Sequence, residues 1–175
     1  MAIQPILRMG DPRLLQKASP VPLPVDEALH VLVQDMRDTM IDADGAGLAA
    51  PQIGVGWQVV IYQLENNPRY PDQDPIPFTV LINPQITPLS EETVVAWEGC
   101  LSLPGLRGEV ARYQHIHLRA FDLEGRLIDI NLEGFHARVV QHECDHLSGI
   151  VYPMRMSNLA RFGYRQELVE SGVCG

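Results

Sequence analysis

The stretch VVQHECDHLSG, residues 139–149, decides how the rest of the chain must fold. It contains the pattern H-E-x-x-H as His142, Glu143 and His146. Residues four positions apart on an α-helix lie about 40° apart around its axis, so both imidazoles can reach one metal ion. Glu143 then lies beside the ion, where its carboxylate can take a proton from an attacking water and pass it to a leaving group. The pattern therefore predicts a metal-binding helix packed inside the protein.

The residues around this pattern also have helical spacing. Phe135, Val139 and His142 fall at positions i, i+4 and i+7, so they share one helix face. Gly149 is a typical residue for the end of such a helix. Cys144 lies about 200° around the axis from His142 and cannot reach the same ion. We expect that cysteine to pack against other side chains.

One amphipathic helix and several strands precede this segment. Apolar residues recur at helical spacing between residues 26 and 43, with Asp26 as the expected N-cap. Segments rich in β-branched and aromatic residues follow at 57–62, 78–83, 93–97, 115–122 and 127–133. In the fourth of them His115 and His117 alternate with apolar residues, so we expect both to face solvent. The order predicts an α+β fold, with mostly antiparallel β-sheets packed around a central helix that carries the metal motif.

Length and composition indicate one domain. The chain has 175 residues, of which 46% are hydrophobic and 20% charged, so we expect a single catalytic domain over residues 1–175. A net charge of −9 without a basic run argues against direct nucleic-acid binding. An apolar run of about 18 residues is missing, which argues against a membrane span. We expect a cytoplasmic protein, bacterial rather than organellar because no transit peptide is visible.

A catalytic metal site usually has three protein ligands and one open position, so a third ligand must come from elsewhere. The longer peptidase pattern H-E-x-x-H-x-x-G-x-x-H fails, because Tyr152 stands where it needs histidine. Glu167 or Glu170 could act as the glutamate that another peptidase group takes from a later helix. In that peptidase group a helical domain presents the glutamate, and the segment after His146 is too short to form such a domain. Cys100, in the segment WEGCLSLPG, is a better candidate, because a Cys and two His suit a divalent transition metal.

Three segments together resemble those of the peptide deformylase family. The family's segment G-φ-G-φ-A-A-x-Q reads GAGLAAPQ at 45–52, where φ is apolar. Its segment E-G-C-L-S stands at 98–102, and its segment Q-H-E-x-D-H stands at 141–146. The order and spacing agree as well. The resemblance implies an enzyme that removes the N-formyl group from the N-terminal methionine of newly synthesised polypeptides and releases formate.

The resemblance also implies roles for individual residues. The implied metal ligands are Cys100, His142 and His146. Glu143 would be the general base and then the acid, while Gln52 and the backbone N–H of Leu101 would stabilise the oxyanion. The implied native ion is Fe²⁺, and Zn²⁺ or Ni²⁺ can also occupy such a site because thiolate and imidazole suit several metals.

A further set of residues would bind the substrate: Gly45, Ala46, Gly47, Gly99, Phe135 and Val139. The glycines let a backbone edge approach an extended peptide, and the last two would line an apolar pocket for methionine. Two positions depart from the family pattern and leave the side-chain preference open. Ala46 is smaller than the branched residue often found there. Arg138 replaces an apolar residue, and we expect its stem to pack while its charge faces solvent.

Two other classes of function fit parts of the sequence. A general metallopeptidase would use the same helix, but such enzymes normally take histidine or a carboxylate as the third ligand. A non-catalytic protein that captures formylated N-termini would not need all the catalytic positions that are present here. The resemblance to the deformylase family implies formylmethionyl nascent peptides as partners and, transiently, the ribosome. The short tail after residue 155 offers no basic helix for ribosome docking.

Overall fold

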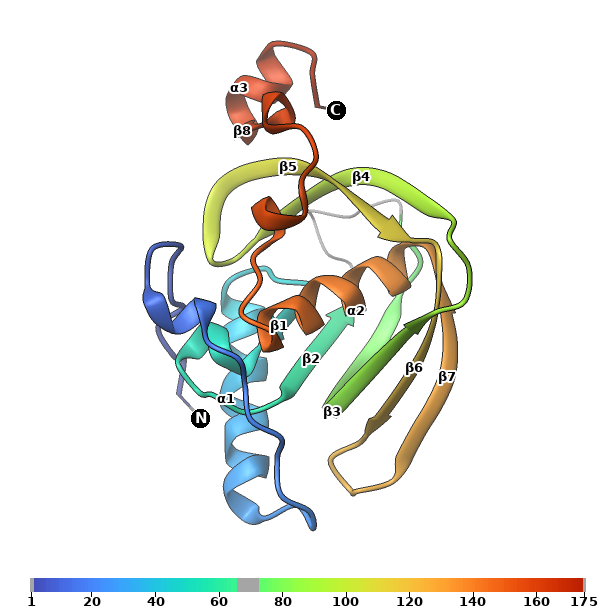
Figure 1. Ribbon diagram of the computed structural model, residues 1–175. Helices are drawn as coiled ribbons and strands as arrows, with labels where there is room; N and C mark the ends of the chain where they lie inside the picture. The colour runs from blue at the N-terminus through green and yellow to red at the C-terminus, as the bar shows by residue number, and fades with distance from the viewer. Residues whose placement is uncertain (1, 66–72, 175) are drawn as a thin grey trace.

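The chain folds into two antiparallel sheets with one helix between them (Figure 1). The computed structural model describes residues 2–65 and 73–174. In this part of the chain the α-helices are α1 (Glu27–Asp42), α2 (Gly134–Leu147) and α3 (Arg165–Glu170). The strands are β1 (Gly47–Ala49), β2 (Val59–Leu64), β3 (Ile76–Pro88), β4 (Thr93–Cys100), β5 (Leu103–Tyr113), β6 (His115–Phe121), β7 (Leu127–Glu133) and β8 (Phe162–Tyr164). The 3₁₀ turns are η1 (Pro12–Leu15), η2 (Ala50–Ile53), η3 (Tyr152–Arg155) and η4 (Leu159–Arg161).

The two sheets divide the strands unequally. The larger sheet has the order β1-β2-β3-β6-β7, and the smaller one has the order β4-β5-β8. All these strand pairs are antiparallel. Figure 1 shows α2 running through the space that the two sheets enclose, and α2 contacts β1, β2 and β7 as well as β5. The expected α+β fold around a central motif helix is therefore confirmed.

Strand β2 explains how two helices fit around the larger sheet. Successive residues of a strand point to opposite faces. Val60 and Tyr62 pack in the cluster that holds α2, whereas Val59 and Ile61 pack in the cluster that holds α1. All four side chains are almost completely buried. The continuous apolar run at 59–62 is thus the signature of a strand covered on both faces.

The expected helices and strands are present, with some differences in length. The first helix spans Glu27–Asp42, and the Asp26 carboxylate accepts a hydrogen bond from the backbone N–H of Leu29 at 3.0 Å, as an N-cap does. The alternation in β6 is confirmed, because Ile116 is buried whereas the His115 and His117 side chains are 38% and 30% exposed. Both histidines face acidic side chains of the surface.

The sequence pattern missed β5, one of the longest strands. Its segment, LPGLRGEVARY, has Pro104, Gly105 and Gly108 in its first half, and these residues are poor strand formers. Hydrogen bonding to β4 on one edge and to β8 on the other stabilises β5 as a strand, although its residues have a low intrinsic preference for that conformation. The short strands β1 and β8 and the short helix α3 were also missed, because three to six residues are too few to show a period.

In the described part of the chain no helix is long and apolar enough to cross a lipid bilayer.

The N-terminal segment of the chain packs against the C-terminal end of α2. The backbone N–H of Ala18 donates to the carbonyl of Leu147 at 2.9 Å. Gly149 follows with φ +71°, and a Cβ at this position would lie 2.4 Å from the carbonyl oxygen of Leu15. A left-handed backbone and a close approach therefore both require glycine here.

We predict that Gly149→Ala destabilises the protein more than Gly125→Ala does. Gly125 has a similar φ of +76° but nothing within 4 Å of its added Cβ, so it is a matched control for the backbone cost alone. The collision with Leu15 should lower the free energy of unfolding by at least about 1 kcal/mol more, measured by urea denaturation. Equal losses in the two variants would show that the contact with Leu15 is unimportant.

Candidate metal centre

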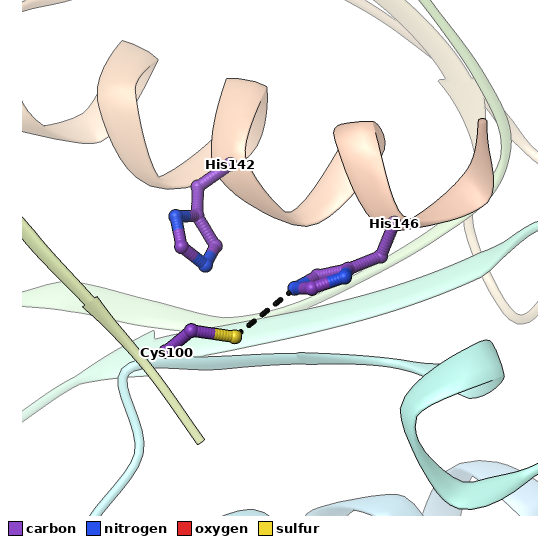
Figure 2. A group of neighbouring side chains, drawn as sticks. All are labelled: Cys100, His142 and His146. Atoms are coloured by element: carbon purple, nitrogen blue, oxygen red, sulfur yellow. Dashed lines mark hydrogen bonds between the residues drawn. The ribbon is translucent and has the colours of Figure 1, made fainter. Parts of the chain in front are cut away.

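Side chains from β4 and α2 converge on one point. Figure 2 shows the Cys100 thiol and the rings of His142 and His146 pointing into a common space. Their ligand atoms all lie within 4.8 Å of one another, and Cys100 Sγ is 3.3 Å from His146 Nε2. All three residues are buried. The end of a strand and two successive turns of a helix thus bring together the three residues that the sequence indicated.

A buried carboxylate orients the first histidine. Nδ1 of His142 lies 2.8 Å from Glu98 Oε2, which leaves Nε2 to point towards Cys100. Burial alone would raise the pKa of the Glu98 carboxyl. The hydrogen bonds and charges of His142 and Arg112 have a larger effect in the opposite direction, so this pKa lies well below its usual range. A carboxylate in this position fixes the tautomer and orientation of a metal-binding imidazole. Sequence reasoning missed this role, although Glu98 is only two residues from Cys100.

The donor set fits a divalent transition metal. Burial opposes ionisation of Cys100, but His146 and His142 outweigh it and hold the pKa of the thiol well below its usual value. The thiolate is the form of cysteine that binds metals. A metal ion bound by one thiolate and two imidazoles would keep a fourth coordination position free, as in catalytic sites. These residues therefore suit a divalent transition metal.

Glu143 lies beside the ligands with a free carboxylate oxygen. Its side chain is buried, and Oε2 has no hydrogen-bond partner within residues 2–65 and 73–174. Burial raises the pKa of Glu143 to about 7. A carboxylate that can gain and lose a proton near neutral pH is suited to general base and acid chemistry. Gly47 makes room for it, because a Cβ there would lie 2.5 Å from Glu143 Oε1.

The amide of Gln52 is held in a fixed orientation. Its Oε1 accepts a hydrogen bond from the backbone N–H of Ala49 at 2.8 Å. Its Nε2 therefore points to the other side, 3.4 Å from Cys100 Sγ and 3.2 Å from Ser102 Oγ. The side chain is almost completely buried. The amide N–H group is thus aimed at the metal centre and does not face solvent.

The predicted substrate-binding residues line a single pocket next to these groups. The lining includes Gly45, Ala46, Gly47, Gly99, Phe135 and Val139, together with Gln52, Cys100, Leu101, His142 and Glu143. Trp97 and Arg138 also line it. His146, which is only 1% exposed, is not among the lining residues. The lining therefore combines apolar side chains with Cys100, His142 and Glu143.

The other residues considered as a third ligand do not join this group. Tyr152, which stands where the longer peptidase pattern needs histidine, stacks its ring on that of His142, with centroids 6.1 Å apart. Glu167 and Glu170 are exposed on α3. Cys144 packs against the core, and burial raises the pKa of its thiol, as expected for a cysteine that does not bind the metal.

Comparisons with known proteins agree with this geometry. The sequence profile of the polypeptide deformylase family matches residues 3–162. The chain belongs to this family. It is therefore a metal-dependent hydrolase that removes N-formyl groups from nascent peptides.

Curated and structural relatives extend over almost the whole chain. Peptide deformylase 1 of Nitrosomonas europaea is 57% identical over 166 residues, which are 95% of this chain and 94% of the relative. Peptide deformylase 1 of Bordetella pertussis is 55% identical with the same coverage. The solved class I type b peptide deformylase of Acinetobacter baumannii with Met-Ala-Ser bound has a TM-score of 0.85 and 36% identity, and the match covers 89% of this chain and 99% of that one.

The expectation for Arg138 was wrong, because its charge is buried. Its guanidinium donates to Glu98 Oε1 at 2.7 Å and to the backbone carbonyls of Val110 and Val94 at 2.9 and 2.6 Å. The residue is 8% exposed. Helical spacing could not indicate this, because the acidic partner comes from a strand 40 residues away.

We predict that Gly47→Ala impairs formate release without loss of bound metal. The new Cβ would displace the Glu143 carboxylate, which is no ligand, so the rate should fall by at least about tenfold while metal content stays at the wild-type level. Gly56→Ala is the matched control, because its Cβ would have nothing within 4 Å. Formate release and metal content are measured on the same preparations. Wild-type turnover in Gly47→Ala would contradict the close approach.

Proposed function

We propose that the deformylase reaction takes place in this pocket, with one divalent metal held by Cys100, His142 and His146. The observation that carries the proposal is their convergence beside Glu143, a buried carboxylate with a free oxygen. A bound metal would supply Lewis-acid chemistry, polarising the formyl carbonyl and lowering the pKa of water. Both sheets contribute to the pocket, which supports residues 1–175 acting as one catalytic domain.

The proposed proton carrier is Glu143. Its carboxylate takes a proton from the attacking water and then gives it to the amine that leaves. The attack on the formyl carbon makes a tetrahedral oxyanion. The Gln52 amide, held by Ala49, and the backbone N–H of Leu101 donate to this oxygen. Donors of this kind contribute about 2.7–4 kcal/mol each to stabilising the transition state.

The proposed substrate is an extended peptide with an N-terminal formylmethionine. Strand β1 is the end strand of the larger sheet, and in the described part of the chain no strand pairs with its other edge. An extended peptide can add to such an edge through backbone hydrogen bonds. Phe135 and Val139, which line the pocket together with Trp97, offer an apolar place for the methionine side chain. The relative from Acinetobacter baumannii binds Met-Ala-Ser, a peptide that begins with the same residue.

We place this activity in the bacterial cytoplasm, where formylated chains are made. The named relatives come from bacteria, which supports this placement. Because the substrates emerge from ribosomes, we also propose a transient association with the ribosome. In the described residues the tail after residue 155 forms only the short elements η4, β8 and α3, so any such contact would not use a long basic helix.

Formate release from a short formylmethionyl peptide tests the function. The protein is prepared without oxygen and loaded in turn with Fe²⁺, Ni²⁺ and Zn²⁺. Glu143→Ala should keep one ion per chain but lose about 10²- to 10⁴-fold in rate, because it removes the general base. Cys100→Ala should lose the ion, and Cys144→Ala, the matched control in the same motif, should keep both ion and activity.

Two results would contradict the proposal. One is the absence of formate from protein that holds one ion per chain. The other is an unchanged metal content in Cys100→Ala. Cleavage of an unformylated peptide without formate release would favour a general peptidase.

We propose Fe²⁺ as the native ion and predict that the iron form loses activity in air faster than the nickel form. Oxygen can oxidise Fe²⁺ itself, and it can also oxidise the Cys100 thiolate that would bind the ion. Residual formate release is measured after timed exposure of both forms, with anaerobic samples as controls. Equal rates of decay would count against an iron–thiolate site.

A further inference from the structure

Arg138 reaches the same carboxylate as His142, from the preceding turn of α2. The two residues are four positions apart and share one helix face. Arg138 Nη1 donates to Glu98 Oε1 at 2.7 Å, while His142 Nδ1 lies 2.8 Å from Glu98 Oε2. One helix therefore contacts both oxygens of one carboxylate. The orientation of that carboxylate decides where the imidazole points.

The Glu98 carboxylate has a full set of donors. Arg112 approaches from β5 and donates through Nε to Oε1 at 2.9 Å and through Nη2 to Oε2 at 3.0 Å. Together with Arg138 and His142, this gives each oxygen two partners, about as many as a carboxylate can accept. The side chains of Glu98 and Arg112 are only 4% and 5% exposed. At such low exposure each of these hydrogen bonds is electrostatically stronger than it would be in water, so the loss of one donor is costly.

Arg138 also ties the helix to both strands of the smaller sheet that lie next to it. Its guanidinium donates to the carbonyl of Val94 on β4 at 2.6 Å and to that of Val110 on β5 at 2.9 Å. Those two bonds hold the guanidinium in place while its Nη1 contacts Glu98. A neutral or shorter side chain could not satisfy the three acceptors together.

We propose that Arg138 is a positioning residue of the metal centre, which holds Glu98 so that His142 presents Nε2 to the ion. Its positive charge also withdraws electron density from Glu98 and so sets how strongly His142 donates to the metal. This inference rests on the proposed metal site. Partners that orient a metal-binding histidine typically change metal affinity by about 10- to 100-fold when they are removed. If Arg138 were only a wall of the methionine pocket, its loss would change peptide binding instead.

Cobalt binding tests this role, with Arg138→Gln and Arg138→Lys as the variants. Arg155→Gln is the matched control, because Arg155 pairs with Asp145 at 2.6 Å, in the same charged network but away from Glu98. The affinity for Co²⁺ is measured by competition with a chelator, and the visible absorption bands report the geometry of the ligands. The Michaelis constant for a formylmethionyl peptide is measured separately.

We expect Arg138→Gln to weaken Co²⁺ binding by about 10- to 100-fold and to shift the visible bands. The Michaelis constant should stay within about twofold of wild type, since the residues proposed to contact the methionine, Phe135, Val139 and Trp97, are retained. Arg138→Lys keeps the charge but not all three bonds, so its bands should lie between those of wild type and Arg138→Gln. Arg155→Gln should resemble wild type.

Several results would overturn the inference. A folded Arg138→Gln protein with wild-type affinity and bands would do so, and so would an equal change in Arg155→Gln. If Arg138→Gln does not fold, unchanged bands in Arg138→Lys would be decisive against it. Failure of the wild-type protein to bind Co²⁺ would instead refute the metal centre itself.

Discussion

The structure depends on the burial of a helix that carries many polar side chains. Among the buried residues of α2 are Arg138, Gln141, His142, Glu143, Asp145 and His146. Burying such groups costs free energy unless each finds a partner. The partners come from the β4–β5 pair, where Glu98 and Arg112 meet the helix through paired charges. The polar face of α2 thus selects the sheet on which it packs.

The same pairing prepares the chemistry. Because Glu98 orients His142 and the last residue of β4 is Cys100, the donor atoms of Cys100, His142 and His146 lie close together. Glu143, one residue further along the helix, faces the larger sheet at Gly47 instead of a charged partner. Its carboxylate is therefore buried yet free, and burial brings its pKa to about 7. The same helix thus carries the two histidines of the proposed metal site and, between them, a buried carboxylate with an oxygen left unpaired among the described residues.

Local spacing was enough to predict the features that lie within one element. The i, i+4 relation of His142 and His146 and the apolar spacing of α1 are of this kind. Cys100 lies 42 residues before His142, so helical spacing could not identify it as a ligand. Its role was predicted by rejecting the other candidates and by the resemblance to a family. The buried position of Arg138 could not be predicted, since it depends on an acid and two carbonyls supplied by other strands. Tertiary pairing also explains why β5 forms despite its glycines and proline.

X-ray absorption of the zinc-loaded protein tests the central claim most directly. Replacing Cys144 and Cys174 by alanine leaves Cys100 as the only cysteine. The account predicts one sulfur neighbour at about 2.3 Å and two imidazole nitrogens at about 2.0–2.1 Å from the zinc. A zinc surrounded only by nitrogen and oxygen, in protein that holds one ion per chain, would contradict it.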